Sequence, residues 1–193
     1  MASTHDSAAL LASWDVRYER KAVLLLALGF GLVGLDRWII APLFPAMMQH
    51  LDLDYQDLGL IIGILGVAWG IFSTVAGAVC DRVGRRKIII PAILMFSCLS
   101  CLSGFATGLV SLLVIRTIMG VSEGAFCPAS VAAKGEASHP KRCGLNQGLQ
   151  MSMFALLGLG LAPVIATQLL DVLPSWRWVF SSLRFPRDCA AQS

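Results

Sequence analysis

Charged residues are scarce in this chain: Asp, Glu, Lys and Arg make up only 14% of its 193 residues. A soluble domain carries about 25% charged residues, whereas 56% of the residues here are hydrophobic. This shortage of charge excludes an ordinary soluble domain and indicates a protein that lies in a lipid bilayer. The net charge of +3 is too small and too scattered for a nucleic-acid-binding protein, so we expect no nucleic-acid partner.

The sequence also lacks the patterns of catalytic and cofactor chemistry. It has no glycine-rich nucleotide loop and no arrangement of nucleophile and base, so we expect neither an enzyme nor a bound cofactor. Six cysteines are present, and Cys98 and Cys101 form a CxxC pair. No other ligand type flanks this pair at the spacing of metal sites, and we expect no metal. Because Cys80, Cys98, Cys101 and Cys127 lie within or at the ends of apolar runs, we interpret them as small apolar residues.

Long apolar runs take up most of the chain. A helix needs ~20 apolar residues to cross the ~30 Å hydrocarbon core of a bilayer. By this measure we predict an all-α, polytopic membrane helix bundle with spans at about residues 22–47, 58–80, 88–107, 109–133 and 144–170. The same reading divides the chain into a cytoplasmic N-terminal segment (1–21), a partial transmembrane domain (22–180) and an aberrant polar tail (181–193).

The segments between the runs alternate in charge. Residues 17–21 contain three basic residues, whereas the loop at 52–57 contains three aspartates and neither Lys nor Arg. The turn at 81–87 is strongly basic, the loop at 107–108 is uncharged, and residues 134–142 are basic again. Lys and Arg collect in short cytoplasmic loops, so the N-terminus is predicted to be cytoplasmic. We expect a multi-pass protein of the inner or plasma membrane.

Four charged residues nevertheless lie inside the predicted spans: Asp36 and Arg37 in the first, Arg116 and Glu123 in the fourth. Each opposes insertion by ~2.5–3.5 kcal/mol at mid-helix. From the rise of ~1.5 Å per residue, Asp36, Arg37 and Arg116 lie at a similar level in the bilayer. Glu123 lies two turns deeper than Arg116 on the same helix face. An anionic substrate could bind the arginines of this cluster while the carboxylates exchange protons.

A purely structural interpretation of these charges is also open. Asp36 would pair with Arg116, and Arg37 with Glu123, only to hold the helices together. Because ionisable groups inside membranes usually mark substrate or proton pathways, the functional interpretation is favoured.

Small residues recur in the second run. Gly59, Gly63, Gly66 and Gly70 are separated by four, three and four positions, which places them on one helical face. Small faces let membrane helices approach closely, so we expect this face to pack against another helix. In the fifth run, Pro163 is expected to kink the helix or free a backbone carbonyl.

The basic turn after the second run has a recognisable pattern, Gly77-x-x-x-Asp81-Arg82-x-Gly84-Arg85-Arg86. This pattern resembles the signature loop of the major facilitator superfamily. The later runs add Arg116-x-x-x-Gly120-x-x-Glu123-Gly124 with Pro128, then Gly158, Gly160 and Pro163, and finally Trp176-Arg177-Trp178-x-x-Phe180. The resemblance implies the N-terminal half of a major-facilitator fold.

Within that superfamily, the charge pattern of this chain resembles that of the organic anion:cation symporters. The pattern consists of adjacent Asp36 and Arg37 in the first run and Arg116 and Glu123 in the fourth. The resemblance implies proton-coupled symport of a sugar acid or another carboxylate. It makes Asp36 and Glu123 proton sites, and Arg37 and Arg116 residues that bind or gate the anion.

The resemblance also implies roles outside the charge cluster. The conformational latch loop would comprise Gly77, Asp81, Arg82, Gly84, Arg85 and Arg86, with Asp81 as the carboxylate that latches the outward-facing state. Gly120, Gly124 and Pro163 would be positions of helix packing or kinking.

The sequence departs from the superfamily in two respects. Members have about twelve spans in two related halves, whereas five are predicted here, and the tail after Phe180 does not follow the family pattern. We therefore expect a truncated chain that lacks the C-terminal half and does not transport alone.

Two alternatives to symport stay open. One is a proton-driven antiporter of a drug or metabolite, and the other is a membrane fragment without transport activity. A complete Gly-Pro-x-x-Gly-Gly element in the fifth run would favour the antiporter, but residues 162–167 read Ala-Pro-Val-Ile-Ala-Thr.

Overall fold

The computed structural model describes residues 15–172 together with Trp176 and Val179. Over these residues the chain is all-helical, and five helical segments are long and apolar enough to cross a membrane. They are α2 (Val16–Leu51), α3 (Tyr55–Val83), α4 (Arg85–Ser103), α5 (Leu109–Ala137) and the composite segment Pro140–Leu170. The predicted all-α bundle is thus confirmed. The predicted polar tail and most of the aromatic stretch before it lie outside the described residues.

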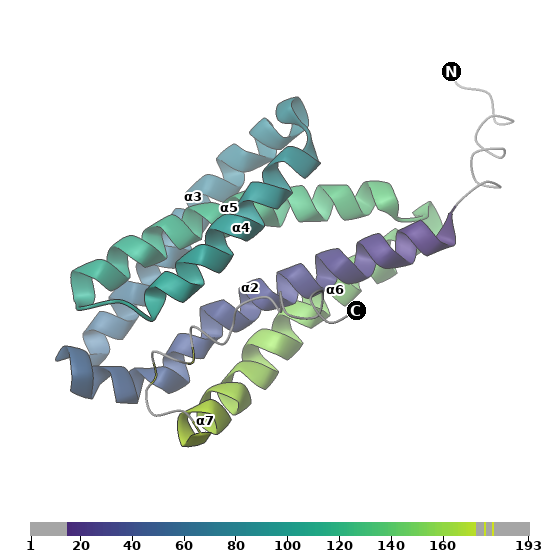
Figure 1. Ribbon diagram of the computed structural model, residues 1–193. Coiled ribbons are helices and arrows are strands. Elements are labelled where there is room, and N and C mark those ends of the chain that lie inside the picture. The colour runs from purple at the N-terminus through teal and green to yellow at the C-terminus, as the bar shows by residue number, and fades with distance from the viewer. Residues whose placement is uncertain (1–14, 173–175, 177–178, 180–193) are drawn as a thin grey trace, which may run out of the picture.

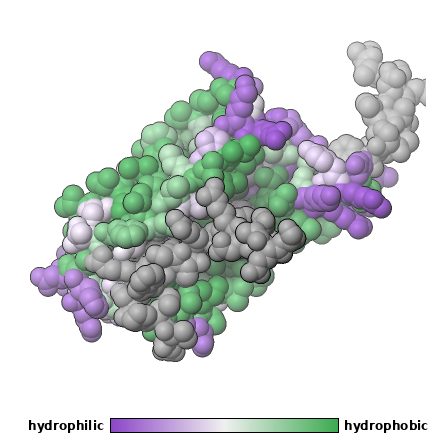
Figure 2. Space-filling view, viewed as in Figure 1, coloured by the Kyte–Doolittle hydropathy of each residue, from purple (hydrophilic) through white to green (hydrophobic). Residues whose placement is uncertain are grey.

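The helices run back and forth between the two ends of the bundle (Figure 1). The start of α2, the link from α3 to α4 and the link from α5 to α6 lie at one end, and the links from α2 to α3 and from α4 to α5 lie at the other. Hydrophilic residues gather at the ends and hydrophobic ones between them (Figure 2). This distribution fits a bundle whose middle lies in hydrocarbon.

Local sequence explains where two of the helices begin and end. The side chain of Asp15 caps α2 by accepting hydrogen bonds from the backbone N–H groups of Arg17 and Tyr18, at 2.8 and 3.2 Å. A single residue, Gly84, separates α3 from α4, with φ of 95° and ψ of 138°. Side chains disfavour this positive φ, so glycine permits the sharp break in the basic turn.

The fifth segment changes its winding near its middle. It consists of a short 3-10 turn (Pro140–Arg142), α6 (Cys143–Ala155), the π-helical η2 (Leu156–Leu161) and α7 (Ala162–Val172). Pro163 has no N–H group to donate, and its ring conflicts with the carbonyl four residues earlier in a regular helix. The wider π turn lies directly before this proline.

Two glycines of α5 make a close contact with α3. A Cβ atom added to Gly120 would lie 2.6 Å from the backbone oxygen of Leu65, and one added to Gly124 would lie 2.8 Å from that of Trp69. The backbones of α5 and α3 therefore touch along a Gly-x-x-x-Gly face. This contact fixes the height of α3 relative to the charged residues of α5.

The glycine face of α3 does not pack against another helix as predicted. Among the described residues, nothing lies within 4 Å of a Cβ added to Gly59, Gly63 or Gly70. At Gly66 such an atom would meet only the guanidinium of Arg37, at 3.9 Å. The expectation that this face packs against another helix is wrong for this part of the chain. Small residues on one helix suffice for close approach, and here α5 supplies them.

Candidate functional site: a charge cluster between α2, α3 and α5

Asp36 of α2 and Arg116 of α5 meet inside the bundle, as their predicted depth required. Their side chains are 5% and 1% exposed, respectively. Nη1 of Arg116 lies 3.5 Å from Oδ2 of Asp36 and 3.4 Å from its backbone oxygen. Ser100 of α4 donates a hydrogen bond to Oδ1 of the same carboxylate. Asp36 thus joins three helices, and Ser100 is a partner that sequence analysis missed.

Glu123 is also fully buried, two helical turns from Arg116 along α5. Within the described part of the chain, neither oxygen of its carboxylate has a hydrogen-bond partner. The Arg37–Glu123 ion pair of the structural interpretation is absent among these residues, whereas the Asp36–Arg116 pair is present. Burying a carboxylate without compensation costs free energy, and among the described residues no ion pair or hydrogen bond of the Glu123 carboxylate offsets that cost.

Arg37 points to α3 rather than to α5. Its guanidinium carbon lies 5.2 Å from the centroid of the Trp69 ring, within the range of a cation–π contact. Among the described residues Arg37 forms no ion pair, although its side chain is partly buried. Trp69 therefore belongs to the site, and spacing along the sequence gave no sign of it.

The two arginines line a small hollow of about 10 Å³. Its remaining walls are aliphatic, formed by Ile40 of α2 and by Ile61, Ile62 and Leu65 of α3. Cationic groups beside apolar walls suit an anion that carries an apolar body. A drug-sized ligand fills about 300–1,000 Å³, whereas a hollow of this size has room for about one water molecule. A larger ligand would need space beyond the helices described here.

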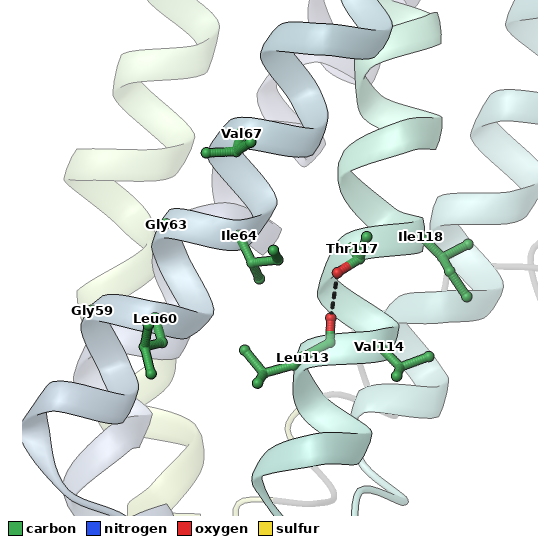
Figure 3. A pocket seen from close by; sticks show the side chains of 9 residues that line it. All are labelled: Gly59, Leu60, Gly63, Ile64, Val67, Leu113, Val114, Thr117 and Ile118. Atoms are coloured by element: carbon green, nitrogen blue, oxygen red, sulfur yellow. Dashed lines mark hydrogen bonds between the residues drawn. The ribbon is translucent and has the colours of Figure 1, made fainter.

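A larger groove of about 500 Å³ runs between α3 and α5 (Figure 3). It is lined by Gly59, Leu60, Gly63, Ile64, Val67, Leu113, Val114, Thr117 and Ile118. The hydroxyl of Thr117 donates to the carbonyl of Leu113 at 2.7 Å, so the polar group of the lining is satisfied within its own helix. The lining of the groove contains no charged residue and none of the predicted site residues.

The predicted latch loop is organised around Arg85. Its guanidinium pairs with Glu136 near the end of α5, and it lies 4.0 Å from Asp81 one turn earlier. Arg82 and Arg86 are exposed and have no ion pair among the described residues, and a Cβ added to Gly77 would meet nothing within 4 Å. Sequence analysis missed Glu136, although a carboxylate at the same end of the bundle as the basic turn is a natural partner for it.

A second buried polar group lies near the same end of the bundle. Lys134, predicted to lie in a loop, is instead part of α5 and fully buried. Its ammonium donates to Oε1 of Gln150 in α6, and Nε2 of Gln150 donates to the hydroxyl of Ser130 at 3.0 Å. Loop assignment from charge alone failed here because the hydrogen bonds to α6 satisfy a lysine inside the bundle.

The sequence model of the Major Facilitator Superfamily matches residues 26–183, which is most of the chain. The chain belongs to the Major Facilitator Superfamily. It is therefore a multi-pass membrane protein of a transporter family and not an enzyme, as predicted.

Two curated relatives in this superfamily are named for small organic molecules. A "Probable 4-methylmuconolactone transporter" of Cupriavidus pinatubonensis is 33% identical over 157 residues, covering 80% of this chain and 36% of the relative. The "4-hydroxybenzoate transporter PcaK" of Pseudomonas putida is 33% identical over 148 residues, covering 76% of this chain and 32% of the relative. The chain thus spans about a third of the length of these relatives.

A solved structure shares the fold. The bacterial homologue of the human lysosomal transporter Spinster, in an inward-facing and occupied conformation, superposes with a TM-score of 0.79 at 19% identity. The match covers 89% of this chain and 42% of that one. The helices described above are therefore the N-terminal portion of a major-facilitator fold.

Proposed function

We propose that this chain forms the N-terminal portion of a proton-coupled transporter for a small organic anion, and that the anion is an aromatic carboxylate. The observation that carries the proposal is the pair of arginines, Arg37 and Arg116, beside the aliphatic walls of one hollow. Guanidinium groups bind carboxylates through paired hydrogen bonds. The relative named for 4-hydroxybenzoate supports an aromatic acid as the cargo, and the relative named for 4-methylmuconolactone supports a small organic molecule.

The walls of the hollow favour an aromatic acid over a sugar acid. A sugar acid presents a hydroxyl on nearly every carbon, and each needs a hydrogen-bond partner when it leaves water. Ile40, Ile61, Ile62 and Leu65 offer none through their side chains. An aromatic ring gains from the same contacts because its apolar surface leaves water.

Proton coupling follows from competition for Arg116. The carboxylate of Asp36 already occupies one side of that guanidinium. An incoming anion competes with the Asp36 carboxylate for Arg116, and a proton on Asp36 weakens that competition. Glu123, whose carboxylate has no partner among the described residues, is the second proton site of the proposal.

Transport itself needs a second half. Alternating access is the rocking of two halves around a site near the middle of the membrane, and the matched relatives are about three times as long as the aligned region. The substrate would then bind between the hollow described here and the helices of the other half. We propose that this chain alone binds the anion weakly and does not carry it across a membrane.

Calorimetry on the chain in lipid nanodiscs tests the proposal. We expect 4-hydroxybenzoate to bind with uptake of protons, measured from the dependence of the binding heat on buffer. Galactonate and the neutral 4-hydroxybenzyl alcohol should bind at least about tenfold more weakly. Equal binding of galactonate would contradict the aromatic class, and equal binding of the alcohol would contradict anion recognition.

A hybrid protein supplies the transport readout. Residues 26–183 would replace the matching segment of the Pseudomonas putida transporter, and uptake of 4-hydroxybenzoate would be measured with and without a proton gradient. Gradient-driven uptake is expected. Expulsion of a cationic dye without uptake of the acid would favour the antiporter alternative.

A further inference from the structure

Arg37 lies against two residues of α3, Gly66 and Trp69, which together we call the Arg37 seat. Its guanidinium carbon lies over the ring of Trp69, 5.2 Å from the centroid. Its Nη2 atom lies 3.9 Å from the place where a Cβ of residue 66 would be, a place that Gly66 leaves empty. Residues three apart share a helix face. On this face Gly66 leaves room for the guanidinium, and the ring of Trp69 contacts it.

The way Arg37 is held differs from the way Arg116 is held. Arg116 pairs with the carboxylate of Asp36, which uses part of its hydrogen-bonding capacity. The ring of Trp69 attracts the Arg37 cation, and it has no oxygen or nitrogen acceptor that would take up an N–H donor. Arg37 therefore keeps its charge in place, partly buried, while its donors at the edge of the plane stay available.

We propose that Gly66 and Trp69 are positioning residues that hold Arg37 for the carboxylate of the transported anion. This inference rests on the proposed function, because the anion is its ligand. Both arginines border the same hollow, so the anion meets one guanidinium that is paired with Asp36 and one that has no ion pair among the described residues. Arg37, the guanidinium without an ion pair, gives the first contact.

Trp69 can act on the anion in two different ways, by positioning Arg37 or by stacking on the substrate directly. The ring face turned to Arg37 is occupied by the guanidinium, so the substrate does not stack on that face. Trp69 then acts through Arg37 and serves any carboxylate equally, aromatic or not. A stacking role would instead favour aromatic acids alone.

Reactivity of Arg37 tests the seat without any substrate. The purified chain is treated with phenylglyoxal, and mass spectrometry gives the modification rate of each arginine. Trp69→Leu should raise the rate at Arg37 about threefold or more, relative to the exposed Arg82, while Trp69→Phe, which keeps an aromatic face, should stay within about twofold. Arg116 should stay protected in both variants, because general loosening of the fold would expose it as well.

Gly66→Val should raise the reactivity of Arg37 in the same way, because the added methyl groups occupy the space of its guanidinium. Gly63→Val is the matched control, since a Cβ there meets nothing within 4 Å. An unchanged rate at Arg37 in both Trp69→Leu and Gly66→Val would overturn the seat, whatever the chain binds.

The affinity for two carboxylates tests whether Gly66 and Trp69 position Arg37 for the anion. Calorimetry in nanodiscs compares 4-hydroxybenzoate with cyclohexanecarboxylate, which has the same charge and no aromatic ring. Trp69→Leu should weaken both by about 3- to 30-fold, the range of a partly buried cation–π contact, and Trp69→Phe should restore most of the affinity. Loss of 4-hydroxybenzoate binding alone would show direct stacking and overturn the positioning role. Absence of binding in the unmodified chain would reject the proposed function, and the reactivity of Arg37 would still decide the seat.

Discussion

Arg116 of α5 reaches Asp36 of α2 across the interior of the bundle, with Nη1 3.5 Å from Oδ2 and both side chains almost fully buried. Arg37, the neighbour of Asp36, leaves this pair and lies over Trp69 of α3 instead. Two arginines that approach one hollow thus have different partners. The first forms an ion pair with a carboxylate, whereas the second has no ion pair among the described residues.

Breaking the Asp36–Arg116 pair on one side should destabilise the bundle. Asp36→Asn leaves Arg116 as a buried cation without its carboxylate, and removing one partner of a buried pair costs about 3–5 kcal/mol. Replacing both residues, as in Asp36→Asn with Arg116→Met, should be less harmful than the sum of the two single changes. Thermal unfolding in detergent, arranged as a double-mutant cycle, measures the difference. Additive effects would show that the two side chains do not interact.

Glu123→Gln should separate transport from stability. The change keeps the shape of the side chain and removes its charge, and no hydrogen bond among the described residues is lost. We expect the melting temperature to stay the same or rise. In the hybrid transporter, proton-driven uptake of 4-hydroxybenzoate should be lost, while exchange of internal for external substrate continues.

Asp36→Asn is the comparison for this experiment, because it should lower stability as well as uptake. Equal loss of uptake and exchange in Glu123→Gln, together with a lower melting temperature, would mean that Glu123 has a structural role.

Part of the site was predictable because helix geometry is regular. Asp36 and Arg116 lie on antiparallel spans with known starting points, so the rise per residue placed them at one level. The direction of Arg37 was not predictable in this way. Adjacent residues on a helix point about 100° apart, and the partner of Arg37, Trp69, lies on a helix whose rotation only tertiary packing determines.

The glycines of α3 also show that sequence spacing does not determine which helix a face contacts. Spacing correctly grouped Gly59, Gly63, Gly66 and Gly70 on one face, but it did not indicate what that face would meet. Packing of α3 and α5 is set by Gly120 and Gly124, whose Cβ atoms would collide with the backbone of α3. The small face of α3 consequently borders the apolar groove and, at Gly66, the guanidinium of Arg37.

Gly120→Ala should destabilise the bundle, because its Cβ would lie 2.6 Å from the oxygen of Leu65 and 2.9 Å from the Cβ of Ala68. Overpacking of this kind costs about 1–3 kcal/mol. Gly63→Ala is the matched control on the facing helix, where nothing lies within 4 Å and alanine has the better helix propensity. Denaturation of the two variants in mixed micelles should give shifts of opposite sign. A neutral Gly120→Ala would mean that α3 and α5 are further apart than the structure places them.

Gly84→Ala and Gly77→Ala should likewise have opposite effects, although both glycines belong to the same signature loop. Gly84 has φ of 95°, which alanine adopts only with strain, so its replacement should lower stability by about 1 kcal/mol. Gly77 lies inside α3 with open space around it, and alanine there should raise stability by about 0.5–1 kcal/mol. Thermal unfolding of the 193-residue chain measures both changes. If Gly77→Ala proves neutral for stability yet abolishes uptake in the hybrid transporter, its small size serves transport through contact with the second half.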